Sequence, residues 1–201
     1  MTSGPDIASV EFWFDPACPF TWRTSRWLVD VAGRRRIDVQ WRLMSLSILN
    51  EGRDVPEQYR EGMRQSRRAL RVLAAAQQAS GSGAVGRLYT IVGGHKHEQG
   101  QVYDDEMYTN GCRGGRVARR ACGADEEKWD ASVRTSHDEA QQRVGTEAGS
   151  PIIALDGGRA YFGPVVVPPP TGDRADRLFD ALRLLSSVPA FSELKRARAP
   201  I

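Results

Sequence analysis

One segment, FWFDPACPFTW at residues 12–22, requires a buried strand to run through a short turn directly into a helix. The strand begins earlier, because ASVEFWF at 8–14 alternates along its length and is rich in β-branched and aromatic residues. Pro19 suits the first helical position, and Gly33 supplies a stop. IDVQWRLM at 37–44 is a second strand. A strand, a helix of this length and a strand form a right-handed unit whose two strands are parallel.

The remaining chain divides into a helical block and a second unit that contains strands. Residues 56–79 have helical periodicity, with arginines on the outer side. We expect 80–147 to be helical with loose joints, because glycine-rich stretches precede a helix-forming segment that starts with acids. Two short apolar runs around the turn DGG predict a β-hairpin over 151–164. An amphipathic helix over 173–187 closes the chain.

Composition narrows the class of function. The 201 residues carry a net charge of only +3, mixed along the chain, which argues against nucleic acid as a partner. We expect the basic clusters at 33–38 and 194–201 to be a solvated loop and a frayed tail. No apolar run reaches the roughly 18 residues that a membrane span needs. The 28 basic residues include only Lys96, Lys128 and Lys195 as lysines, a bias that GC-rich codons produce and that suggests an actinobacterial host.

The cysteines and the N-terminus indicate the compartment. Cys18, Cys112 and Cys122 are odd in number and irregular in spacing, and no apolar leader follows the start of the chain. A chain of this length can bury a core without disulfides. We therefore expect a cytoplasmic protein with reduced thiols.

Cys18 stands where the turn meets the helix. As the N-cap it would place its sulfur over the unpaired N–H groups of the first turn, while Pro19 loses no hydrogen bond. We expect the thiolate to be favoured, since a pKa of about 6.5 in place of about 8.5 corresponds to about 2.7 kcal/mol and makes the sulfur a nucleophile. The alternative is a buried cysteine that fills the end of the strand.

Several segments resemble one family in the same order along the chain. They are FWFDPACPFTW, TSRW, MSLSILNE, RDVPEQYREGM, GSPIIALDG, YFGPV and ELKR, and the similarity runs from about residue 10 to residue 198, with poor agreement over 80–147. These segments are similar to the DsbA-like branch of the thioredoxin superfamily, and most similar to actinobacterial mycothiol-dependent nitroreductases. Kappa-class glutathione transferases and hydroxychromene carboxylate isomerases resemble the chain more distantly.

The resemblance implies an α/β class and a thioredoxin-like fold, ordered βαβ and then ββα, with a DsbA-like helical insertion. In residue numbers, 8–50 and 148–190 would form the thioredoxin-like domain. Residues 51–147 would form the helical insertion domain, and 191–201 a tail.

The resemblance also assigns roles to GSP at 149–151. It implies that Pro151 is a cis-proline facing the nucleophile, and that the backbone of Ser150 holds an extended thiol substrate. From the residues alone, Pro151 would be an ordinary proline at the start of a strand.

Thr21 occupies the position at which dithiol members of the superfamily carry a second, resolving cysteine. No internal disulfide can form at this motif. Near the third helical position, the Thr21 hydroxyl and N–H could both point toward the Cys18 sulfur and stabilise the anion, or the side chain could simply pack there. Cys112 and Cys122 are the remaining candidates to resolve a disulfide on Cys18, and nothing in the sequence places either one beside it.

Five further residues are candidate substrate walls. Phe20 and Trp22 flank the cysteine, Asn50 follows the second strand, and Tyr59 and Arg60 open the insertion. Ligands of open α/β sheets bind at such positions. Each of these residues could instead belong to the core or the surface.

HKH at 95–97 lacks the ligand spacing of a zinc site, so we expect no metal. The resemblance places a histidine before a glutamine and a glycine, as in HEQG, so His97 could line the cleft and carry protons. A surface loop is the alternative.

These observations favour a thiol-dependent oxidoreductase with one nucleophilic cysteine, acting on a small disulfide or electrophilic substrate. A low-molecular-weight thiol, mycothiol in such a host, would be the co-substrate, with no tightly bound cofactor. The nitroreductase activity of the relatives depends on a redox-active pair that this chain lacks. The alternatives are a redox-neutral cis-trans isomerase or transferase of a conjugated small molecule, and a scaffold protein. We expect a monomer or homodimer.

Overall fold

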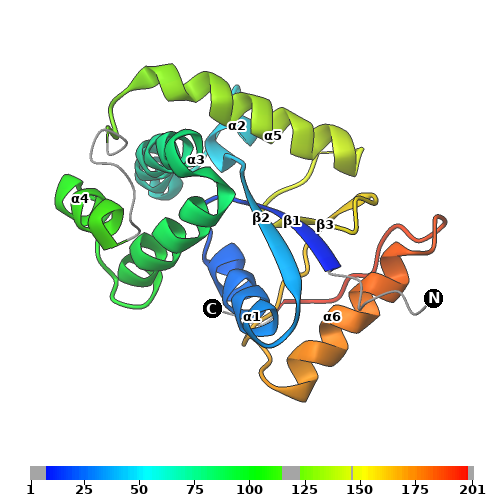
Figure 1. The fold of residues 1–201 in the computed structure, drawn as a ribbon. Helices are drawn as coiled ribbons and strands as arrows, with labels where there is room; N and C mark the ends of the chain where they lie inside the picture. Colours follow the sequence, from blue (N-terminus) through cyan, green and yellow to red (C-terminus); the bar gives the residue numbers. More distant parts are fainter. Residues whose placement is uncertain (1–7, 115–122, 146, 199–201) are drawn as a thin grey trace.

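The computed structural model describes residues 8–114, 123–145 and 147–198. Its elements follow the expected order (Figure 1). The strands are β1 (Ala8–Phe14), β2 (Ile37–Leu43), β3 (Ile152–Leu155) and β4 (Ala160–Phe162). The helices are α1 (Pro19–Arg34), α2 (Leu46–Leu49), α3 (Glu57–His97), α4 (Asp105–Gly114), the short 3-10 helix η2 (Glu127–Trp129), α5 (Asp130–Val144) and α6 (Asp173–Ser186).

The four strands form one sheet in the order β2-β1-β3-β4. β1 and β2 are parallel and joined through α1, with Ala8 opposite Ile37. β3 runs antiparallel to β1, and β4 runs antiparallel to β3. The expected βαβ unit and β-hairpin are therefore both confirmed, and they share one sheet.

Side chains of β1 supply both faces of this sheet because successive residues of a strand point to opposite sides. Phe12 and Phe14 enter the larger hydrophobic cluster with α1, α3 and α6. Trp13 enters a smaller cluster on the other face with Ala140 of α5. Figure 1 shows α5 along one face of the sheet and α1 and α6 along the other. The segment that leads to Cys18 thus begins in a strand that is buried on both sides.

α3 contains a joint just after residue 80, where the glycine-rich stretch begins. Gly81, with φ of 74°, separates two helical stretches, and the second runs to His97 through several further glycines. Two of those glycines permit close packing. A Cβ at Gly86 would lie 2.6 Å from Cδ1 of Trp41, and a Cβ at Gly93 would lie 2.6 Å from Cε3 of Trp22. These glycines therefore mark helix contacts with indole rings.

The C-terminal tail also differs from the expectation that it is frayed. After α6 the chain returns along the sheet toward α1 (Figure 1). The ring of Phe191 lies 5.6 Å from that of Tyr161 on β4. The Arg198 guanidinium lies over the rings of Phe20 and Phe162. The described part of the tail, 191–198, thus contacts the first turn of α1 and the end of β4.

Within the described ranges, no helix combines the length and apolarity that crossing a bilayer would require.

Replacing Gly93 with alanine should destabilise the protein, because the added methyl group would overlap the indole of Trp22, which is 2 % exposed. We expect a loss of about 1–3 kcal/mol in the free energy of unfolding, measured by urea denaturation. Gly62 is the matched control on the same helix, since nothing lies within 4 Å of a Cβ there. Gly62→Ala should stabilise by about 0.5–1 kcal/mol, and equal effects of the two substitutions would contradict the packing role.

Candidate active site

Cys18 lies at the junction that the sequence indicated. It is the N-cap of α1 with Pro19 in the first turn, and its residue is 7 % exposed. The thiol is free, and its sulfur lies 3.7 Å from the carbonyl oxygen of Ser150, to which the S–H donates. The structure therefore brings the cysteine and the GSP segment together, beside the end of β1 and the start of β3.

The charge state of Cys18 differs from the expectation. Burial raises the pKa of the Cys18 thiol, and the Asp15 carboxylate adds to this rise. Hydrogen bonds from the hydroxyl and N–H of Thr21 and from the N–H of Phe20 lower the pKa, but their sum is smaller. The predicted preference for the thiolate is therefore wrong for the protein without substrate, because the cap is too deeply buried. The resting thiol is protonated at neutral pH.

A chain of hydrogen bonds ends at this sulfur. The N–H of Asp15 donates to Oγ of Ser150 over 2.9 Å, and Oγ of Ser150 lies 2.7 Å from Oγ1 of Thr21. Each hydroxyl has one proton. When the Thr21 hydroxyl donates to the sulfur, it accepts from Ser150, which in turn accepts from the Asp15 N–H. The orientation that satisfies all groups therefore directs donors toward the Cys18 thiolate.

Asp15 is the site residue that the sequence reasoning missed. It is fully buried, and its carboxylate accepts hydrogen bonds from three groups: the N–H of Ala17 at 2.8 Å, the N–H of Leu46 at 2.7 Å and the hydroxyl of Ser66 at 2.6 Å. Burial raises the pKa of Asp15, and these three donors oppose the rise. The signal was available, since an acid directly after an apolar strand must find buried donors.

The Ser150–Pro151 peptide bond is cis, as the resemblance implied. The Ser150 carbonyl accepts one hydrogen bond in this structure, from the Cys18 S–H. A thiolate has no proton to donate. Ionisation of Cys18 therefore removes this hydrogen bond and leaves the carbonyl with one more free lone pair.

His97 and Trp22 pack together against the turn at residues 15–18, where Trp22 is buried and His97 is half-buried. Nε2 of His97 lies 2.8 Å from the carbonyl of Pro16, which also accepts from the Tyr103 hydroxyl at 2.8 Å. The imidazole stacks on Trp22, at 5.6 Å between ring centres, and Trp22 is buried in the core. Burial lowers the pKa of His97, so the ring is neutral and donates from Nε2. The idea that Trp22 lines an open substrate cleft is not supported, because Gly93, Tyr89 and His97 cover it.

The remaining wall candidates lie in different surroundings. Phe20 is half-buried beside Cys18 and under Arg198. Tyr59 is 56 % exposed in the first turn of α3. Asn50 ends α2, where its Nδ2 donates to the carbonyl of Leu46 over 2.7 Å. Thus only Phe20 of these three lies next to Cys18.

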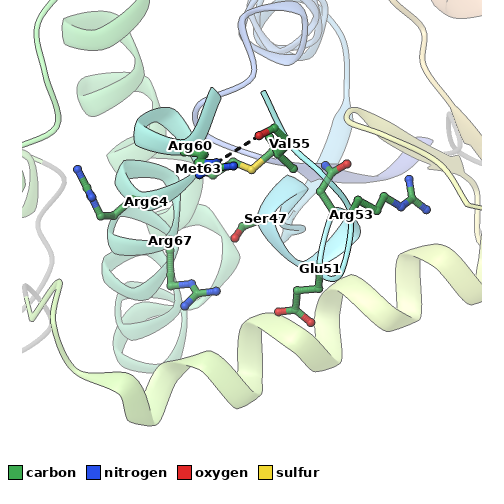
Figure 2. A pocket seen from close by; sticks show the side chains of 9 residues that line it. Ser47, Glu51, Arg53, Val55, Arg60, Met63, Arg64 and Arg67 are labelled. Atoms are coloured by element: carbon green, nitrogen blue, oxygen red, sulfur yellow. Dashed lines mark hydrogen bonds between the residues drawn. The ribbon is translucent and has the colours of Figure 1, made fainter. Parts of the chain in front are cut away.

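A separate cavity of about 440 Å³ contains Asn50. Figure 2 shows its lining between α2 and the first turns of α3, with the hydrogen bond from Nε of Arg60 to the carbonyl of Val55. The lining residues are Ser47, Asn50, Glu51, Arg53, Val55, Arg60, Met63, Arg64 and Arg67. Three of the four arginines form ion pairs. Arg53 pairs with Glu147, Arg60 with Glu57 and Arg64 with Glu61. Most of the positive charge is therefore neutralised, and the cavity includes neither Cys18 nor Pro151.

Among the described residues, Cys18 is the one free cysteine. Cys112 is disulfide-bonded, so the expectation of reduced thiols fails there, and Cys122 lies outside the described residues. Across the part of the chain that the structure describes, no cluster of three His, Cys, Asp or Glu side chains could hold a metal ion. His137 is buried, and its Nδ1 accepts from the N–H of Ser45.

Comparison with known sequences identifies relatives over nearly the whole chain. A family model described as "Rv2466c-like: Mycothiol-dependent nitroreductase Rv2466c" matches residues 17–196. The uncharacterized protein Rv2286c of Mycobacterium tuberculosis is 30% identical over 204 residues, which cover 96% of this chain and 84% of that protein.

Comparison with solved structures gives the same fold. The cytosolic disulfide reductase DsbM from Pseudomonas aeruginosa aligns with a TM-score of 0.58 and 16% identity over 88% of this chain and 99% of its own. A 2-hydroxychromene-2-carboxylate isomerase aligns with a TM-score of 0.61 and 14% identity over 89% and 95%. At these identities the likeness concerns the fold alone. It confirms a thioredoxin-like architecture of DsbA type.

Replacing Asp15 with asparagine should lower stability, because an amide cannot accept from all three donors that the carboxylate satisfies. We expect a loss of about 1–3 kcal/mol in the free energy of unfolding at pH 7, measured by urea denaturation. Ser66→Ala removes one donor and leaves the other two in place, so it should cost less. The interpretation is wrong if Ser66→Ala proves the more damaging of the two.

Proposed function

The chain belongs to the Rv2466c-like family of mycothiol-dependent nitroreductases, and we propose that it is an oxidoreductase that works with a single nucleophilic cysteine. Cys18 is the nucleophile, and a low-molecular-weight thiol, mycothiol by family, is the co-substrate. The substrate is a small disulfide or another small electrophile. The observation that carries this proposal is the free Cys18 beside cis-Pro151, with the hydroxyl of Thr21 in place of a second thiol.

The reaction with a disulfide takes two exchanges. The Cys18 thiol loses its proton to water, and the thiolate attacks one sulfur of the substrate, which forms a mixed disulfide and releases the other half as a thiolate. The thiolate of the small thiol then attacks the mixed disulfide. It bonds to the substrate sulfur and releases Cys18 as a thiolate. One disulfide has been exchanged for another, and the second thiol comes from solution.

The hydroxyl of Thr21 has two parts in this scheme. It donates toward the sulfur at the end of the chain from Asp15 through Ser150, which favours the thiolate against the cost of burial. It also cannot form a disulfide, so the mixed disulfide persists until an external thiol arrives. Binding of substrate at the vacated Ser150 carbonyl would add to the driving force for ionisation.

A redox-neutral reaction is the second candidate. The thiolate of Cys18 could add to a conjugated double bond, allow rotation about the resulting single bond and leave again. The absence of a second cysteine at position 21 fits this scheme equally well, and the isomerase that shares the fold is named for such a substrate class. We also propose that the protein is cytoplasmic, where low-molecular-weight thiols are present. Its partner is a small-molecule substrate.

The rate at which Cys18 is alkylated should rise with pH beyond the range of an ordinary thiol, because burial raises its pKa and only the thiolate reacts. Thr21→Val should move this profile to still higher pH, since it removes a donor that lowers the pKa. Thr21→Ser keeps the hydroxyl and should leave the profile nearly unchanged. The measurement is peptide mapping after timed exposure to iodoacetamide, and a profile that ignores the Val substitution would remove the role given to Thr21.

Thr21→Cys should convert the enzyme to a dithiol type. We expect Cys18 and the new thiol to form an intramolecular disulfide under mild oxidation, so that the stable adduct of Cys18 with a small thiol disappears from the intact mass. In the parent protein, one equivalent of adduct should form and turnover should consume thiol in step with product. Turnover without thiol oxidation would favour the redox-neutral reaction over the oxidoreductase.

A further inference from the structure

Three side chains from distant parts of the sequence meet beside the nucleophile. Phe20 lies two residues after Cys18, in the first turn of α1. Phe162 ends β4, and its ring lies within 3.6 Å of a Cβ placed on Gly149, next to Ser150. The guanidinium of Arg198 lies 5.1 Å from the centre of the Phe20 ring and 5.5 Å from that of Phe162. The two rings and the cation therefore border the Cys18–Pro151 pair.

This arrangement is held by the tail and the sheet. Phe191 packs on Tyr161, the residue before Phe162, so both ends of the tail segment rest on neighbouring residues of β4. The N–H of Gly163 donates to the carbonyl of Pro151 over 2.8 Å, which ties the end of β4 to the cis-proline. The position of Arg198 is thus linked to the position of the proline opposite the nucleophile.

Among the described residues, Arg198 has no ion-pair partner. The side chain is exposed, and no carboxylate within the described ranges lies at ion-pair distance from it. A guanidinium that rests on ring faces keeps its N–H groups directed outward in a fixed plane, which suits a carboxylate held by two hydrogen bonds. Arg23 and Lys96 add positive charge on the His97 side of the turn.

The exposed aromatic surface has a matching chemistry. Phe162 is 41 % exposed and Phe20 is half-buried, although aromatic side chains are usually covered. A flat conjugated ring can stack against such faces, and a carboxylate on that ring would then reach the guanidinium. A saturated neutral ligand would use neither feature.

We propose that Phe20, Phe162 and Arg198 form a subsite for the flat, anionic end of the substrate, an aryl or otherwise conjugated carboxylate, and that this subsite sets its electrophilic atom beside Cys18. The inference deepens the proposed function and rests on Cys18 as the nucleophile. It makes Arg198 a specificity residue of the reaction.

The test compares two aromatic disulfides that differ in charge. The Cys18 thiolate displaces one aromatic thiolate from either 5,5′-dithiobis(2-nitrobenzoate), which carries carboxylates, or 4,4′-dithiodipyridine, which is neutral at pH 8. Release of the aromatic thiolate is followed in a single turnover, with the Cys18→Ala protein as blank. Arg198→Gln should lower the rate ratio of the anionic over the neutral probe about fivefold. Arg196→Gln, which removes the same charge two residues away in the tail, should leave the ratio unchanged.

The subsite proposal would be overturned if Arg198→Gln and Arg196→Gln lowered the rate ratio equally, or if neither lowered it. A second measurement decides the matter without any reaction: binding of benzoate and of neutral benzamide to the Cys18→Ser protein, followed by NMR titration. Benzoate should bind better than benzamide, and Arg198→Gln should abolish the preference while Arg196→Gln keeps it. No preference in the parent protein would also overturn the inference. If Cys18 reacts with neither disulfide while benzoate still binds through Arg198, the proposed function fails and the subsite stands.

Discussion

The carboxylate of Asp15 is the group on which the active-site geometry depends. It is buried directly after β1 and accepts from the turn that follows it, from the start of α2 and from the first part of α3, before the bend at Gly81. A buried carboxylate is unfavourable unless its oxygens are satisfied, so the three donors must remain in place together. Because they come from three parts of the chain, one charge fixes the relative positions of the sheet, the nucleophile turn and the insertion.

The pKa of the Cys18 thiol depends on the same turn. The tight turn that Asp15 holds places the sulfur at the start of α1, but also beneath the Ser150 carbonyl and out of water. Burial then raises the pKa of the thiol, and the hydroxyls of Thr21 and Ser150 act against it. The resting enzyme in this view carries a protected thiol. Such a thiol resists adventitious oxidation, because the thiolate is the form that oxidants attack.

Local sequence patterns predicted those elements of the fold whose conformation depends on their own segment alone. The bounds of β1, the start of α1 at Pro19 and the turn of the β-hairpin at Asp156–Gly157 agree with the structure. The glycines of α3 misled the reasoning, because their small size serves contacts with Trp22 and Trp41 that no local window contains. The sign of the Cys18 pKa shift failed for a similar reason, since Cys18 is buried against Ser150, which lies 132 positions away along the chain. The roles of Asn50, Tyr59 and the domain boundaries at 51 and 148 stay predictions.

Two parts of α3, one on each side of the bend at Gly81, form hydrogen bonds with the turn at residues 15–18. Before the bend, Ser66 holds the side chain of Asp15, and at the far end His97 holds the carbonyl of Pro16. One continuous stretch of chain therefore clasps adjacent residues of the nucleophile turn from two directions. The insertion and the thioredoxin-like part are consequently not interchangeable modules. A chimaera between relatives would have to carry α3 together with residues 15–18. Otherwise the new helix would lack the side chains that bind this turn.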